Sequence, residues 1–215
     1  MENRILLKAR DLMLHNGVKH VTMDDIANQL GISKKTIYQF YKDKDTLVMA
    51  VVNLELEEQS LKCTTSQETA DNAVHEMFML LEDIQQMFKN MNPLTMQELA
   101  KYFPDAFERI QKHKDVFMHQ IIRDNLMKGV AEGFYRKDID PDILSIYRLE
   151  TSFVPFNVQL YPFSRFDIGK VTMQITENFV YGLMTIKGIE LMEKYKHQET
   201  TIANAMQDET TQIKK

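Results

Sequence analysis

The chain has 215 residues, of which 44% are hydrophobic and 27% charged, with only seven glycines and five prolines. This length allows a substantial buried core, and the scarcity of turn-forming residues favours a helical fold class over a sheet-rich one. The net charge of −5 excludes a protein that is basic overall, but residues 1–52 hold eight lysines and arginines against six acidic residues, so a local basic surface is still compatible with the composition.

The N-terminal segment MENRILLKARDLMLHNG mixes charged and apolar residues within each helical turn, so it lacks the apolar stretch of a signal peptide. The chain contains no run of eighteen apolar residues, which argues against a membrane span. Cys63 is the only cysteine, so an intrachain disulfide is excluded and a reducing compartment is favoured. These features predict a cytoplasmic protein with no membrane partner.

After a first helix over residues 3–15, two short helices with a tight turn between them are predicted in residues 22–41. Thr22 and Asp25 have the spacing of a capping box, which begins a helix, and Gly31 ends that helix. Ser33 is a suitable N-cap for the second helix. This arrangement is the helix-turn-helix layout, in which the second helix enters the major groove of DNA.

The second of these helices has a polar face. Its lysines and hydroxyl groups, at Lys34, Lys35 and Thr36, can bond phosphates, while Gln39 and the lysines can reach the edges of bases. A simpler interpretation is also open, in which Thr22 and Ser33 are caps only and the lysines are solvated charges.

The stretch VTMDDIANQLGISKKTIYQFYKDKDTL resembles the N-terminal DNA-binding domain of the TetR family of transcriptional regulators. The matching residues are Thr22, Ile26, Ala27, Gly31, Ile32, Ser33, Thr36, Ile37, Tyr38, Lys44 and Leu47. Tyr41 departs from the pattern, where phenylalanine is usual. The resemblance implies that Thr22, Tyr38 and Lys44 contact phosphates, and that Lys34, Lys35, Thr36 and Gln39 lie nearest the bases. With the cap Ser33, these are the candidate DNA-binding residues.

The rest of the chain keeps a helical period with polar or proline-containing breaks. We expect a loop at residues 62–71, a helix over 105–132 and a last helix over 168–195, in a total of about nine helices. The predicted fold class is all-α, with a helix-turn-helix DNA-binding domain at 1–47, a larger helical ligand-binding and dimerisation domain at 48–197, and a polar mobile tail at 198–215.

A ligand pocket is expected in the larger domain, because most of the fifteen methionines and twelve phenylalanines lie after residue 76 and such side chains suit apolar ligands. Pro155 should kink its helix and free a carbonyl beside the cavity. The candidate lining residues are Met77, Leu81, Met118, Ile122, Phe153, Phe156 and Asn157. For any one of them, an ordinary place in the core is the alternative.

The last predicted helix carries an apolar stripe. The resemblance implies that the last two long helices pair with a second copy of the chain as a four-helix bundle, and the alternative is a helix buried in its own monomer. The candidate interface residues are Val171, Ile175, Phe179, Gly182, Leu183 and Ile186. A homodimer would read a palindromic operator with two recognition helices one DNA turn apart.

The sequence contains neither a Cys/His metal set nor a nucleotide-binding or catalytic motif, so we expect no enzyme, no catalytic residue, no metal and no cofactor. The resulting hypothesis is a homodimeric DNA-binding repressor that an apolar or amphipathic small molecule releases from double-stranded DNA. One alternative is a regulator without a ligand, controlled by a protein partner or by its abundance. Another is a helical enzyme or scaffold that carries a helix-turn-helix.

Overall fold

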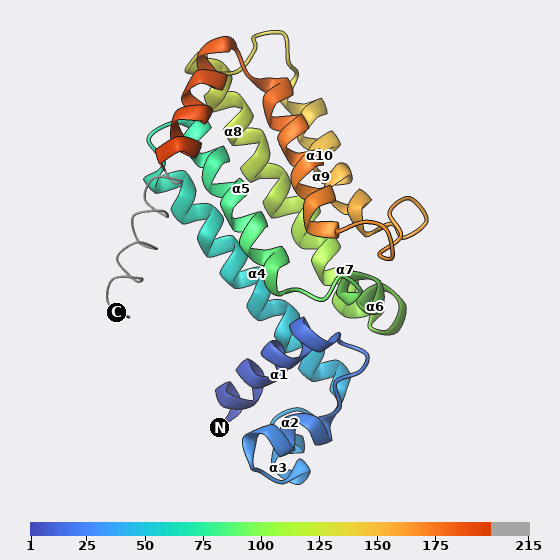
Figure 1. Cartoon of the computed structure of the whole chain (residues 1–215). Coiled ribbons are helices and arrows are strands. Elements are labelled where there is room, and N and C mark those ends of the chain that lie inside the picture. The colour runs from blue at the N-terminus through green and yellow to red at the C-terminus, as the bar shows by residue number, and fades with distance from the viewer. Residues whose placement is uncertain (199–215) are drawn as a thin grey trace, which may run out of the picture.

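The computed structural model describes the backbone of residues 1–198 and the side chains in this range apart from those of residues 88–90. Within residues 1–198 the chain is helical, with no β-strand and no helix long and apolar enough to cross a membrane (Figure 1). The elements are α1 (Glu2–Asn16), α2 (Met23–Leu30), α3 (Lys34–Tyr38), α4 (Lys44–Thr69), α5 (Ala73–Asn90), α6 (Thr95–Tyr102), α7 (Pro104–His113), the π-helical turn η1 (Lys114–Met118), α8 (His119–Ala131), α9 (Pro141–Phe153), the 3-10 turn η2 (Val154–Phe156) and α10 (Ile168–Leu183). The predicted all-α fold class is confirmed. The predicted tail, beyond Gln198, lies outside the described residues.

Helices α1 to α3 pack against the first half of α4 and form the N-terminal part of the molecule (Figure 1). Their shared core is apolar, and its innermost side chains are Ile5 and Ala9 from α1, Ile26 from α2, Ile37 from α3 and Leu47 from α4. Leu99 of α6, Ala106 of α7 and Phe103 between these helices belong to the same cluster. The N-terminal helices are therefore packed directly against the junction of α6 and α7.

Helix α4 runs from the N-terminal helices along the C-terminal part (Figure 1). The loop that we expected at residues 62–71 is wrong, because α4 continues to Thr69. Hydroxyl groups in this polar stretch bond backwards along the helix, from Thr64 to the carbonyl of Ser60 at 2.9 Å and from Thr69 to that of Thr65 at 2.7 Å. The predicted domain boundary after residue 47 falls inside this helix.

The C-terminal part is a bundle in which α5, α8, α9 and α10 pack around a second apolar cluster. Its fully buried side chains include Val74, Leu126, Val180 and Tyr135. The Tyr135 hydroxyl donates to the carbonyl of Ala73 at 3.1 Å. This bond fixes the segment after α8 against the start of α5.

The last helix expected from the sequence is interrupted in the structure. Helix α10 ends at Leu183, Met184 forms an isolated antiparallel bridge with Tyr135, and residues 186–198 are helical again. The break arises because the backbone N–H of Thr185 donates to the carbonyl of Phe134, at 2.9 Å.

Two other expected helices also differ in the structure. The expected kink at Pro155 is wrong, since α9 ends at Phe153 and Pro155 lies in the 3-10 turn that follows. The expected helix over 105–132 is divided by η1 into α7 and α8.

Candidate nucleic-acid interface

The turn between α2 and α3 has the geometry that its sequence predicts. Thr22 and Asp25 form a reciprocal capping box, in which the Thr22 side chain accepts from the Asp25 N–H at 3.2 Å and Asp25 accepts from the Thr22 N–H at 2.8 Å. The Thr22 hydroxyl also donates to the Asp25 carboxylate at 2.6 Å, and this bond, together with the one from the Thr22 N–H, lowers the pKa of Asp25. Gly31 ends α2 with φ 65°, a left-handed conformation that glycine adopts without a steric cost. The chain is thereby turned sharply into α3.

Helix α3 is short, and two side chains fix its orientation. Ile37 is fully buried beneath it, and Tyr41, just after its end, is 5% exposed in the same core. Ser33 caps its N-terminus by accepting from the N–H of Thr36 at 3.1 Å. Tyr41, the residue that departs from the family pattern, is therefore part of the core. The opposite face of α3 points into solvent and carries exposed Lys34, Lys35, Tyr38 and Gln39.

The three predicted basic contacts differ in their surroundings. Lys34 is exposed and pairs with Asp24 of α2 at 2.7 Å, a contact that raises the pKa of the lysine. Lys35 is exposed on the same helix. Lys44 is partly buried at the start of α4, where its ammonium donates to the carbonyl of Lys19 at 2.9 Å and burial lowers its pKa. Lys44 is thus held in place by the turn before α2, whereas the Lys35 side chain extends into solvent.

The eight predicted DNA-binding residues lie at the N-cap of α2, in α3 and the positions that flank it, and at the start of α4. Six of them are exposed, while Thr36 and Lys44 are partly buried. Sequence analysis missed two exposed neighbours, Phe40 and Lys42. Phe40 is exposed because α3 ends at Tyr38 and the following turn directs its ring outward. The hydrophobic period of the sequence did not show that α3 ends after only five residues.

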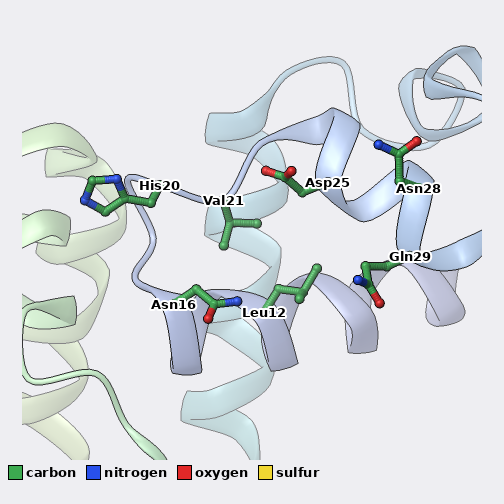
Figure 2. A pocket seen from close by; sticks show the side chains of 7 residues that line it. All are labelled: Leu12, Asn16, His20, Val21, Asp25, Asn28 and Gln29. Carbon is green, nitrogen blue, oxygen red and sulfur yellow. The ribbon is translucent and has the colours of Figure 1, made fainter.

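A cleft of about 400 Å³ lies between the end of α1 and α2, beside this face (Figure 2). Leu12 and Val21 form its apolar floor, and the lining is completed by Asn16, His20, Asp25, Asn28 and Gln29. Asn28 and Gln29 are exposed on α2, the helix that precedes the recognition helix. The cleft belongs to the helix-turn-helix and is separate from the predicted ligand pocket.

The predicted pocket residues do not converge on one cavity. Met77, Leu81 and Ile122 are buried in the second core, and Met118 packs against it. Phe153 and Phe156 form a ring pair with centroids 6.5 Å apart, and Asn157 is exposed. A groove of about 420 Å³ does occur between α9 and α10, but its lining is Tyr147, Thr151, Val154, Gln174, Ile175 and Asn178, none of which was predicted as pocket lining.

The predicted dimer residues divide into two groups. Phe179 and Leu183 are buried in the core of their own chain, which is the alternative that the sequence left open. Val171 and Ile175 are partly exposed, and Gly182 and Ile186 are exposed. Sequence analysis missed an apolar row on α9, where Ile143, Ile146 and Tyr147 are each more than half exposed. Their i, i+3, i+4 spacing places them on one face and was the signal available in the sequence.

Comparison with known proteins places these features in context. Residues 5–51 match the family described as bacterial regulatory proteins, tetR family. The chain is 32% identical over 108 residues to the uncharacterized HTH-type transcriptional regulator YvaF of Bacillus subtilis (strain 168), a match that spans 50% of this chain and 56% of YvaF. It is 26% identical over 183 residues to YhgD of the same organism, likewise an uncharacterized HTH-type transcriptional regulator, with 80% of this chain and 88% of YhgD covered.

The fold recurs among solved structures. A putative transcriptional regulator from Saccharomonospora viridis, solved in complex with choline, matches with a TM-score of 0.69 and 20% identity, over 86% of this chain and 97% of that chain.

Proposed function

We propose that this chain, whose residues 5–51 match the tetR family of bacterial regulatory proteins, is a DNA-binding transcriptional regulator of that family. In this proposal it is a repressor that binds a palindromic operator as a homodimer and is released by a small molecule. The observation that carries this proposal is the exposed face of α3, held by Ile37 and the cap Ser33 and presenting Lys34, Lys35, Tyr38 and Gln39. This face suits the major groove of DNA.

In this proposal the contacts divide by chemistry. Thr22, Tyr38 and Lys44 contact phosphates, while Lys34, Lys35, Thr36 and Gln39 lie closest to base edges. Lys34 must exchange its bond to Asp24 for a bond to DNA, so it contributes less affinity than Lys35. Lys44 uses one donor on the carbonyl of Lys19 and keeps two for a phosphate. Ser33 acts mainly as the cap that orients the others.

The exposed apolar face of α9 supports the homodimer. Ile143, Ile146 and Tyr147 form a row on α9, next to the groove that α9 shares with Ile175 of α10. A second copy of the chain is the occupant that we propose, because two copies joined through α9 and α10 would make a four-helix bundle and bring two recognition helices to one operator. Val171, Ile175, Gly182 and Ile186 extend this surface.

The small-molecule effector would bind in the C-terminal part, in the region of Met77, Leu81, Met118, Ile122, Phe153, Phe156 and Asn157. A protein of this fold is solved in complex with choline, which supports the general idea that a chain of this fold can hold a small molecule. Release requires only that the ligand prefers one arrangement of the helices, a coupling commonly worth about 1–3 kcal/mol. Control by a protein partner or by abundance is the alternative, which would need no ligand.

The proposal is tested by fluorescence anisotropy of the full chain on DNA from upstream of its own gene and on a shuffled duplex of equal length, across a salt series. We expect specific binding to be at least about a thousandfold tighter than binding to the shuffled duplex. Lys35→Ala should weaken binding to the operator by about 1–3 kcal/mol and reduce the preference for the operator over the shuffled duplex. Lys62→Ala removes an exposed lysine from α4 and is the matched control. Equal affinity for both duplexes would overturn the proposal.

A further inference from the structure

Arg148 of α9 is a buried arginine with one hydrogen-bond partner. Its side chain lies in the interface between α9 and α10, and the residue is 5% exposed. Nη2 donates to the Thr176 hydroxyl at 3.1 Å, and the guanidinium carbon lies 5.9 Å from the centre of the Phe179 ring. Within the described part of the chain, Nη1 is buried and has no partner. The N–H groups of Nη1 are therefore available to donate to a further acceptor.

No carboxylate balances this charge among the described residues, where Arg148 forms no ion pair. Burial lowers the pKa of Arg148 to about 10, and the guanidinium is still positive at neutral pH. Burying a charge without a counter-ion costs several kcal/mol in general, and an apolar side chain of similar volume is commonly as stable or more stable. Arg148 is therefore a poor choice for stability alone.

A second unpartnered group lies on the facing helix. Thr172 of α10 is buried, and its hydroxyl has no hydrogen-bond partner among the described residues. Thr172 precedes Thr176 by one helical turn, so both hydroxyls lie on the face of α10 that is directed toward the core. Arg148, Thr172 and Thr176 thus provide a guanidinium and two hydroxyls inside an apolar bundle.

We propose that this cluster, Arg148 with Thr172 and Thr176, binds the carboxylate of an effector whose remaining body is apolar. The idea rests on the proposed function, since it names the chemical class of the ligand that releases the DNA. A carboxylate accepts two parallel bonds from one guanidinium and leaves acceptor positions for hydroxyl donors. Arg148 is the only buried lysine or arginine in the described part, so a single negative charge fits better than a doubly charged phosphate.

The position of the cluster also gives binding a consequence. Arg148 and Thr176 belong to α9 and α10, whose outer faces carry the proposed dimer surface. A carboxylate between these helices would change how they pack. The same change would alter the relative placement of two copies and hence of their recognition helices.

The test uses the full chain and three probe classes of matched length: octanoate, decanoate and dodecanoate; the corresponding 1-alkanols; and the corresponding alkyltrimethylammonium ions, with choline. Binding is measured by calorimetry and by the shift in Tm, and release of DNA is measured by anisotropy. We expect at least one carboxylate to bind about tenfold more tightly than its alkanol. Arg148→Met should abolish this preference. Arg165→Met removes an exposed arginine from the same part of the chain and should preserve it.

Stability without ligand separates a binding role from a structural one. If Arg148 is a ligand-binding residue, Arg148→Met melts at the same temperature as wild type or higher, because it removes an unpaired buried charge. Thr172→Val should weaken carboxylate binding severalfold without lowering Tm, and this variant serves if Arg148→Met fails to fold. The proposal is overturned if carboxylates bind no better than alkanols, or if Arg148→Met and Thr172→Val bind them as wild type does.

The experiment also separates this inference from the proposed function. Release of DNA by an alkanol or an ammonium ion, with no effect of carboxylates, would reject the carboxylate site and leave the regulator intact. Carboxylate binding that depends on Arg148 but leaves the DNA bound would support the site and reject ligand release. If no probe of any charge binds, the carboxylate site is rejected, and DNA binding is judged by the anisotropy series alone.

Discussion

The buried carboxylate of Glu98 on α6 accepts a hydrogen bond from the backbone N–H of Lys19, at 2.9 Å, in the turn between α1 and α2. Gly17 in the same turn lies so close that a Cβ there would be 2.8 Å from Glu98 Oε2. The ring of His20 is 3.8 Å from the other carboxylate oxygen. Helix α6 is thus bonded to the turn that leads into the helix-turn-helix.

Removing this acceptor should loosen the junction. We expect Glu98→Ala to lower the free energy of unfolding by about 1–3 kcal/mol, because the Lys19 N–H loses its partner in a partly buried contact. Glu98→Gln keeps an acceptor oxygen and should cost less. Urea unfolding measures both, with Glu57→Ala, an exposed position on α4, as the control. A loss at Glu98→Ala no larger than at Glu57→Ala would contradict the assigned role.

The proposed dimer surface is tested at Ile146, which is 56% exposed on α9. Light scattering of the wild type at micromolar concentration should give twice the chain mass of 25.3 kDa. Ile146→Glu should raise the dissociation constant of the dimer at least about tenfold, or 1.4 kcal/mol, since a charge would be buried in an apolar interface. Val116→Glu, at a more exposed apolar residue of η1, should leave the mass unchanged. A wild-type monomer would rule the interface out.

Stability should depend on pH through His113. This residue is buried, its Nε2 lies 2.8 Å from the Ser60 hydroxyl, and burial, with the nearby positive charge of Arg109, lowers its pKa. The unfolded chain therefore binds a proton at a higher pH than the folded chain, so stability rises with pH. The contribution of His113 is complete above about pH 6.5 and is lost as the pH falls from there toward the lower folded pKa.

Urea unfolding of the wild type and of His113→Gln between pH 5 and pH 8 measures this contribution. The variant should show the flatter dependence below about pH 6.5. Equal slopes for the two proteins would show that His113 is not the group responsible.

Cys63 should react slowly. Burial raises the pKa of its thiol to about 11, and the neighbouring acidic groups of Asp83 and Glu76 act in the same direction. Because the thiolate is the reactive form, alkylation by iodoacetamide at pH 8 should be about ten- to a hundredfold slower than in urea-unfolded protein. Mass spectrometry of timed samples gives both rates. Equal rates would mean that the folded chain leaves the thiol accessible and ionised.

Local signals in the sequence predicted the helix-turn-helix well. The capping box of Thr22 and Asp25, the left-handed Gly31 and the cap Ser33 all depend on neighbours within a few residues, and the structure contains each of them. The polar stretch before Thr69 was misread because its hydroxyls bond back along α4 and do not start a loop. The helix propensity of serine and threonine alone does not show whether such a stretch continues a helix or begins a loop.

The features of the C-terminal part that sequence analysis missed depend on distant contacts. The interruption after Leu183 comes from the carbonyl of Phe134, about fifty residues earlier in the chain. Arg148 has the same local pattern as a surface arginine, and only the packing of α9 against α10 buries it. Phe179 and Leu183 lie on the inner face of α10. The spacing of apolar residues alone did not separate this inner face from a face that is open to a second copy of the chain.

Helix α4 connects the N-terminal helices rigidly to the C-terminal bundle. Its 26 residues span about 39 Å at 1.5 Å per residue, and its first half is buried in the same core as α1, α2 and α3. A rigid tilt of only about 5° at the end near Thr69 would therefore move the end near Lys44 by about 3.4 Å, the rise of one base pair. A small tilt of the bundle, which need not break any helix, would thus be enough to shift α3 by one base pair along the major groove of DNA.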